Sequence, residues 1–220
     1  MQVLVHGGAG STPDEPKSRQ RVLERAAEHG GERSNPVDAV EAAVNVLESS
    51  PRFNAGLGGA IQSDGEIRTD AGIMTDDRAV GAVCSMPRVE RAVSVARIVM
   101  EETPHGFVSG EHAVALADAF DVETGVDLRS DRTRERWGDL DSPPGDVEQR
   151  LEWIRDRYGR SDPDGKTNEN DRSRAANGGR PDGLDHDTVG AVAVDGERLA
   201  TATSTGGRWL ALADDVGDVK

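Results

Sequence analysis

Short apolar stretches in the first fifty residues predict a strand followed by two helices. Residues 2–5 (Gln-Val-Leu-Val) predict a strand that opens into a glycine-rich turn at 6–10. Residues 16–30 are polar and compatible with a helix. A second helix is predicted to begin at 34–36 (Ser-Asn-Pro), because proline suits the first helical position. Its apolar residues recur at helical spacing, at Val37, Val40, Val44 and Leu47.

The next seventy residues predict strands and then two further helices. Residues 54–85 are rich in glycine, and their short apolar pieces alternate with turn residues, as in strands. These pieces are 60–61, Ile67 and 79–84. Apolar residues at helical spacing predict a helix over 89–99 and another over 113–120. Ser109 is the candidate cap of the later helix.

The composition changes after residue 120. Residues 121–159 are heavily charged and contain a few apolar anchors, namely Trp137, Leu151, Trp153 and Ile154. Between 160 and 187 the only large aliphatic residue is Leu184, and there is no aromatic residue. Such a segment cannot bury enough apolar area to offset the entropy lost on ordering. We therefore predict a flexible linker over 160–187.

A hairpin is predicted directly after this linker. Residues 188–194 form a continuous apolar run, Asp195-Gly196 makes a turn, and 199–205 form a second strand-like run. Because the first run is not interrupted by polar residues, we expect that strand to be buried on both faces.

Composition and charge restrict the classes of function. The 220 residues allow one ordinary domain, or one layered α/β unit with a long insert. The formal net charge of −15 argues against binding to nucleic acid or to anionic lipid. Only three of the 26 basic residues are lysine, namely Lys17, Lys166 and Lys220. A surface rich in carboxylates and poor in lysine is typical of a protein adapted to high salt.

The remaining features indicate a cytoplasmic protein. No apolar run approaches the roughly 20 residues of a membrane span, and the first residues lack the basic region of a secretory signal. Cys84 is the only cysteine, so no intrachain disulfide or cysteine zinc cluster can form. We expect Cys84 to be a small buried apolar residue.

Thr188 is the candidate nucleophile. It lies where the predicted linker ends and the apolar strand begins, so cleavage of the Asp187–Thr188 bond would make it a new N-terminus. An α-amino group titrates near ~7.7–8.0, so it can act as a base near neutral pH. An N-terminal threonine therefore holds nucleophile and base in one residue. A threonine that simply favours a strand is the alternative interpretation.

Four motifs around this position carry a resemblance to a known family. They are His6-Gly-Gly-Ala-Gly10, Phe53-Asn-Ala-Gly56, His186-Asp-Thr-Val-Gly-Ala-Val192 and Ala202-Thr-Ser-Thr-Gly-Gly207. In order and spacing the chain resembles the plant-type asparaginases, that is, the isoaspartyl peptidase/L-asparaginases among the N-terminal-nucleophile hydrolases. Residues 70–74, 81–83 and 96–101 extend the match, which covers about 1–120 and 184–213.

The resemblance implies an α/β fold, a four-layer αββα sandwich that is incomplete at its C-terminal end. It implies that the precursor cuts itself at Asp187–Thr188 into an α-subunit region (1–187) and a shortened β-subunit region (188–220). The two parts would stay together, as a dimer of such αβ pairs, and need no cofactor. Free Thr188 would hydrolyse the side-chain amide of asparagine or the β-linked bond of an isoaspartyl dipeptide.

The resemblance also implies roles for individual residues. Thr205 matches a threonine that hydrogen-bonds around the nucleophile, Gly206 lines the same pocket, and Asn54 helps to place the nucleophile. The loop 47–57 resembles one that wraps a structural sodium ion, although a tight helix-to-strand turn is the alternative. The backbone carbonyls that match its ligands are those of Leu47, Glu48, Ser50, Phe53, Ala55 and Leu57.

The match fails near the end of the sequence. Asp218 matches the family's partner of the substrate ammonium group, but Asp215 replaces the arginine that pairs with the substrate carboxylate. The sequence ends at Lys220, before further family strands and a Thr-Gly pair that helps to hold the oxyanion. A truncated or frameshifted gene, a fragment of a longer product, and a partner that supplies the missing part are three open explanations.

Two alternative functions follow from these departures. The chain could be a glycosylasparaginase-like or taspase-like hydrolase or protease of the same superfamily. It could also be a catalytically impaired relative that acts only as an interaction partner.

Overall fold

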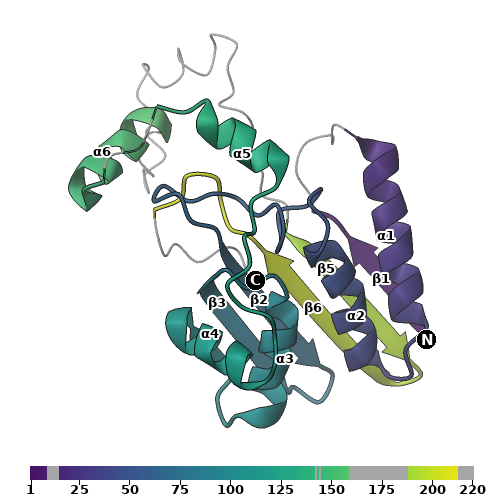
Figure 1. Ribbon diagram of the computed structural model, residues 1–220. Coiled ribbons are helices and arrows are strands. Elements are labelled where there is room, and N and C mark those ends of the chain that lie inside the picture. The colour runs from purple at the N-terminus through teal and green to yellow at the C-terminus, as the bar shows by residue number, and fades with distance from the viewer. Residues whose placement is uncertain (9–14, 142, 144, 159–187, 213–220) are drawn as a thin grey trace, which may run out of the picture.

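A computed structural model describes residues 1–8, 15–141, 143, 145–158 and 188–212. Within these residues, six strands form one sheet in the order β1-β5-β6-β2-β3-β4 (Figure 1). The strands are β1 (Gln2–His6), β2 (Arg68–Thr75), β3 (Val80–Pro87), β4 (Phe107–Ser109), β5 (Val189–Asp195) and β6 (Arg198–Thr205). Neighbouring strands are antiparallel except β3 and β4, which are parallel.

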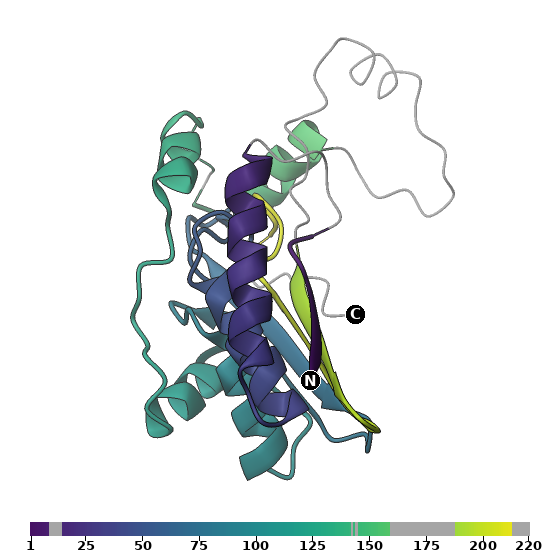
Figure 2. The ribbon, with the colours of Figure 1, turned by 90° about the vertical axis from the view of Figure 1, so that its right-hand side faces the viewer.

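Helices cover one face of this sheet, as Figure 2 shows in side view. They are α1 (Pro16–Gly31), α2 (Pro36–Glu48), α3 (Ala92–Glu102) and α4 (Gly110–Ala119). Two more helices, α5 (Asp131–Gly138) and α6 (Val147–Tyr158), lie beyond the end of the sheet at which β6 stops (Figure 1). Among the helices that the structure describes, none combines the length and hydrophobicity of a membrane span.

Helix α2 shows how the sequence produces this layer. Asn35 precedes the helix in an extended conformation, and its side chain accepts a hydrogen bond from the Asp38 amide at 2.9 Å. Pro36 occupies the first helical position, where the amide it lacks would have no partner. Val40 and Val44 on the apolar stripe are fully buried against β5 and β6. Capping and the apolar stripe therefore agree on where this helix begins and which face it buries.

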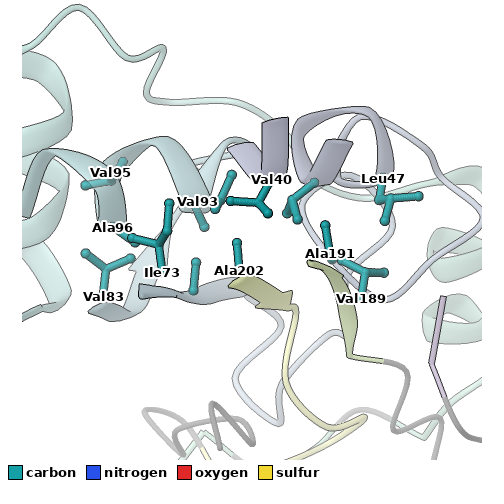
Figure 3. Packing of buried hydrophobic residues seen from close by; sticks show 14 of the residues in the cluster. Val40, Leu47, Ile73, Val83, Val93, Val95, Ala96, Val189, Ala191 and Ala202 are labelled. Atoms are coloured by element: carbon teal, nitrogen blue, oxygen red, sulfur yellow. The ribbon is translucent and has the colours of Figure 1, made fainter. Parts of the chain in front are cut away.

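The core between sheet and helices is made of small aliphatic side chains. Figure 3 shows strand residues, among them Ile73, Ala191 and Ala202, pointing toward the valines of α2 and α3. Close packing at Gly81 brings α3 against β3, because a Cβ there would lie 2.1 Å from the Ala96 carbonyl oxygen. The alanines and the glycine allow a closer approach than larger residues would.

A second, smaller apolar cluster lies beyond the strand ends. Its buried members are Ala60, Ile61, Ile67, Leu128, Trp209 and Leu210. Trp137 of α5 packs edge-on against Trp209 with ring centroids 6.3 Å apart, and Arg136 lies 4.1 Å above the Trp209 ring. Trp153 of α6 also packs here, which confirms the prediction that Trp137 and Trp153 are apolar anchors.

Most predicted elements are confirmed, and the differences have physical reasons. Residues 60–61 form no strand, because they contribute to the second cluster as a loop. Strand β4 was not predicted, since three residues are too few to show a period. Ser109 takes the cap position of α4 but makes no side-chain hydrogen bond there. The predicted linker lies entirely outside the described residues, which resume at Thr188.

The hairpin is confirmed, but the expected burial of its first strand is only partly right. Residues Val189, Ala191 and Ala193 of β5 are buried against the helices. Val192 and Val194, on the opposite face of the same strand, are only half-buried. We call this opposite face of the sheet the open face. Its central residues carry no charge: Leu4, Gly72, Met74, Val80, Ala82, Val192, Val194, Leu199, Thr201 and Thr203.

Candidate active site

Thr188 lies immediately before β5 and is half-buried. Val189 pairs with Ser204 of the antiparallel neighbour β6. Continuing this register by one residue places Thr188 opposite Thr205, which is 3% exposed. Both threonines fall on the open face, because side chains alternate along a strand and Val189 and Ser204 belong to the helix-covered face. The candidate nucleophile and its candidate partner are therefore cross-strand neighbours.

Two glycine contacts bring the N-terminal strand to this end of the sheet. His6 of β1 pairs with Gly190, and a Cβ at Gly190 would lie 2.5 Å from the His6 Nε2 atom. A Cβ at Gly7 would lie 2.4 Å from the Phe53 ring. Because the Phe53 ring is buried, Gly7 has no room for a side chain, and this contact joins the His-Gly-Gly motif to the Phe-Asn-Ala-Gly motif.

Asn54 holds the turn that follows Thr205. Its backbone carbonyl accepts the Gly206 amide at 2.8 Å, and its side-chain amide donates to the Gly207 carbonyl at 2.6 Å. Its side-chain oxygen accepts the Ala60 amide at 2.8 Å. Asn54 is buried, and Gly206 fits beside Gly59, where a Cβ would lie 2.5 Å from the Gly59 Cα. The asparagine therefore positions the backbone of this turn.

The structure thus brings Thr188 and Thr205 together and places Gly206 directly after them, under the control of Asn54. The Thr205 hydroxyl accepts the Gly207 amide at 3.1 Å, which ties it to the same turn. The catalytic roles of these residues stay predictions. Asp187, the other side of the predicted cleavage site, and Asp215 and Asp218 lie outside the described residues.

Sequence reasoning missed two buried carboxyl groups near this site. Asp70 of β2 is 2% exposed and pairs in register with Thr205. Glu48, at the end of α2, is fully buried below the sheet, on the side of Ser204. Asp70 lies in a stretch that matched the family, but only the strand register shows which residue it faces.

The Glu48 carboxyl connects the helices to β6. Its Oε1 atom accepts the Val93 amide at 3.0 Å, at the start of α3. The Oε2 atom and the Ser204 hydroxyl are buried with no hydrogen-bond partner that meets normal geometry in the described structure. Burial raises the pKa of Glu48 to about 8, although Ser204 and the Val93 amide partly oppose this shift. Glu48 is therefore protonated at neutral pH, as a donor next to Ser204.

The loop 47–57 offers backbone oxygens rather than side-chain ligands. The Glu48 carbonyl accepts the Leu57 amide at 2.8 Å, and the Leu47 carbonyl accepts the Ser50 amide at 3.1 Å. Gly56, with a φ of 52°, comes so close that a Cβ would lie 2.4 Å from the Glu48 carbonyl oxygen. Each carbonyl keeps a second lone pair, and hard oxygen ligands suit an alkali ion. The loop therefore fits the expected sodium ligands in chemistry.

Side-chain metal ligands do not gather elsewhere in the described chain. Among the residues that the structure places, no three His, Cys, Asp or Glu side chains form a group that could hold a metal ion.

With this geometry in place, the comparison with known families is specific. The sequence matches the family described as "Asparaginase" over residues 1–220. The chain belongs to this asparaginase family, and its described residues form a mixed α/β fold in which helices cover one face of a six-stranded mixed sheet.

The similar proteins of known name are plant-type asparaginases and isoaspartyl peptidases. The chain is 36% identical to a "Plant-type L-asparaginase" of Thermococcus kodakarensis, over 98% of this chain and 66% of the relative. It is 35% identical to an "Isoaspartyl peptidase/L-asparaginase" of Bos taurus and 34% identical to that of Homo sapiens, over 98% of this chain and 63% of each relative. The chain therefore spans about two thirds of the length of these relatives.

Proposed function

We propose that this protein is an amidohydrolase that uses Thr188 as an N-terminal nucleophile. Its substrates are the side-chain amide of L-asparagine and the β-linked peptide bond of isoaspartyl dipeptides. The proposal rests on one observation, the cross-strand pair of Thr188 and Thr205 beside the turn that Asn54 holds. The names of the relatives support the substrate class.

The chemistry begins with self-cleavage. The Thr188 hydroxyl attacks the Asp187 carbonyl carbon, the peptide C–N bond breaks, and the acyl group moves to oxygen as an ester. Water then hydrolyses this ester and leaves Asp187 as a carboxylate and Thr188 with a free amine. In the substrate reaction this amine accepts the hydroxyl proton while the oxygen attacks the amide carbon. The C–N bond then breaks, the nitrogen takes up this proton, and ammonia or the second residue of the dipeptide departs. Water hydrolyses the β-aspartyl ester and frees Thr188.

Intact mass spectrometry of the purified 220-residue chain tests the first step. At high salt we expect two products, residues 1–187 and a chain that begins at Thr188. Thr188→Ala should stay uncut, whereas Thr188→Ser should be cut more slowly. Release of ammonia from asparagine and of leucine from β-Asp-Leu should then follow the fraction of cut chain.

Two results would contradict the proposal. Cleavage that persists in Thr188→Ala would mean that another protease cuts the chain. Hydrolysis of asparagine by a chain that stays intact at 187–188 would mean that Thr188 is not the nucleophile. Turnover of glycosyl-asparagine or protein substrates alone would favour the glycosylasparaginase-like or taspase-like alternative.

An impaired relative is the second candidate function. One feature of the sequence favours it: Asp215 stands where the resemblance to the family implies an arginine. Losing one member of a desolvated charge pair costs about 2–5 kcal/mol of binding. A chain that is cut at 187–188 but binds neither asparagine nor β-Asp-Leu would support this candidate.

We also propose that the open face packs against a second sheet, which would complete the four-layer αββα arrangement. Four large hydrophobic residues of this face are substantially exposed: Leu4 at 65%, Met74 at 46%, Val80 at 43% and Leu199 at 37%. Residues 1–187 and 188–220 would then be the α- and β-subunit regions of an αβ pair, and two pairs would form a dimer. Analytical ultracentrifugation of the purified chain tests this assembly.

A structural sodium ion in the loop 47–57 is part of the same proposal. The backbone carbonyls of Leu47, Glu48, Ser50, Phe53, Ala55 and Leu57 would hold it and so stiffen the connection between α2 and Asn54. Melting temperatures in sodium and in tetramethylammonium chloride at equal ionic strength test this, with sodium expected to give the higher value.

A further inference from the structure

Asp70 is a buried carboxyl group at the end of the sheet where Thr188 and Thr205 lie. It is 2% exposed, and its Oδ1 atom accepts the Ser85 amide at 2.7 Å. The register between β2 and β3 shifts at this position, so that Asp70 faces a bulge. Ser85 adopts a left-handed φ of 53° in the bulge, which the Asp70 hydrogen bond stabilises. Bulges of this kind commonly redirect side chains beside active sites.

On its other side, Asp70 faces the candidate site. It pairs in register with Thr205 of β6, and Thr188, just before β5, occupies the next position across the sheet when the register is continued by one residue. Directly opposed residues have Cβ atoms about 4.5–5.5 Å apart, so an aspartate and a threonine can hydrogen-bond. All three side chains fall on the open face, since Ala71 and Ile73 of β2 belong to the covered one.

The Thr205 hydroxyl needs an acceptor for its proton. Its oxygen already accepts the Gly207 amide at 3.1 Å, and the residue is only 3% exposed. A carboxylate can accept several hydrogen bonds, so Asp70 can accept one from Thr205 in addition to the one from the Ser85 amide.

We propose that Asp70 is a positioning residue. It accepts a hydrogen bond from the Thr205 hydroxyl and thereby orients the Thr205 oxygen toward Thr188. With its O–H directed to Asp70 and one lone pair occupied by the Gly207 amide, Thr205 presents its remaining lone pair to the nucleophile. Asp70 does not touch the substrate and acts through Thr205. The pairing itself is independent of the proposed function, while its effect on Thr188 rests on that function.

A double-mutant cycle in the full-length chain tests the pairing. Asp70→Asn keeps an oxygen for the Ser85 amide but loses the charge, and Thr205→Val removes the hydroxyl. We expect the loss of Tm caused by Asp70→Asn to fall to about half or less when Thr205 is already valine. Thr205→Ser, which keeps the hydroxyl, should restore the full loss. Equal losses in all three backgrounds would overturn the proposal.

Asp76 provides the matched control at the other end of the same strand pair. Its Oδ1 atom accepts the Leu199 amide at 2.9 Å, much as Asp70 accepts that of Ser85. Asp76→Asn should cause the same change in Tm with Thr205 or valine at position 205, because Asp76 lies far from it. A change that depends on residue 205 would show that the coupling is not specific to Asp70.

The rate of self-cleavage tests the effect on Thr188. In Asp70→Asn we expect cleavage, and then kcat for β-Asp-Leu, to fall at least about tenfold with KM little changed. Asp76→Asn should cleave at the wild-type rate. If the Tm cycle shows coupling between Asp70 and Thr205 but Asp70→Asn leaves kcat unchanged, the positioning role is overturned. If the wild-type chain does not cleave at all, the proposed function fails, while the cycle still decides whether Asp70 holds Thr205.

Discussion

The two faces of the sheet differ in what their side chains meet. On the covered face, Ile73, Ala191 and Ala202 pack against α2 and α3 and are nearly or fully buried. On the open face, Met74 directly follows Ile73 along β2, yet it is 46% exposed. One strand thus places an apolar side chain in the core and the next at the surface.

Along the same strands, residues on the covered face stabilise the fold, while residues on the open face form the candidate site. The covered face is mainly apolar, and it supplies the burial that stabilises the fold. The open face carries Thr188, Thr205 and Asp70 at one end, where β5, β6 and β2 lie side by side. Substitutions on the two faces should therefore affect different properties.

The largest predicted effect compares Ile73→Ala with Met74→Ala. Ile73 is 2% exposed, so its truncation leaves a cavity and should cost about 3 kcal/mol of unfolding free energy. Met74 is 46% exposed, so as long as the open face is uncovered its truncation should cost less than about 1 kcal/mol. Urea denaturation measures both values.

The same pair of variants tests whether the open face is covered in solution. If Met74→Ala costs as much as Ile73→Ala, the open face is buried by another sheet or another copy. Sedimentation of Met74→Asp then shows whether the assembly depends on this face.

A second prediction concerns the carboxyl group within the covered face. Glu48 has a pKa of about 8 in the folded protein, against 4.5 for the unfolded reference. Between these values the folded state holds a proton that the unfolded state has lost, so stability falls as the pH rises toward 8. Unfolding free energy should fall by about 2 kcal/mol between pH 6 and pH 8 relative to Glu48→Gln.

Glu48→Gln is the matched control for this titration. It keeps an oxygen for the Val93 amide and offers an N–H to Ser204, but it cannot ionise in this range. Parallel stability curves for wild type and Glu48→Gln would show that Glu48 does not titrate in this window.

Periodicity predicted the elements well but could not assign residues to the two faces. The stripe of α2 and the hairpin at 189–205 follow from residue spacing alone, because each buries one regular set of positions. Motif order located Thr188 and Thr205, and the structure adds that they are cross-strand neighbours. Asp70 and Glu48 could not be found this way, since a carboxylate looks solvent-exposed in a sequence that is 30% charged. Their burial depends on register and on the packing of α3.

The smallest predicted effect compares two caps within the helix layer of the covered face. Asn35 accepts the Asp38 amide at 2.9 Å, whereas Ser109 caps α4 without a side-chain hydrogen bond. Asn35→Ala should therefore cost about 1 kcal/mol of unfolding free energy, and Ser109→Ala only a few tenths. Because neither residue lies on the open face, both variants should be cut at 187–188 at the wild-type rate. A slower cut in Asn35→Ala at unchanged secondary structure would mean that α2 transmits its position to Asn54 and the site, so the two faces would be coupled rather than separate.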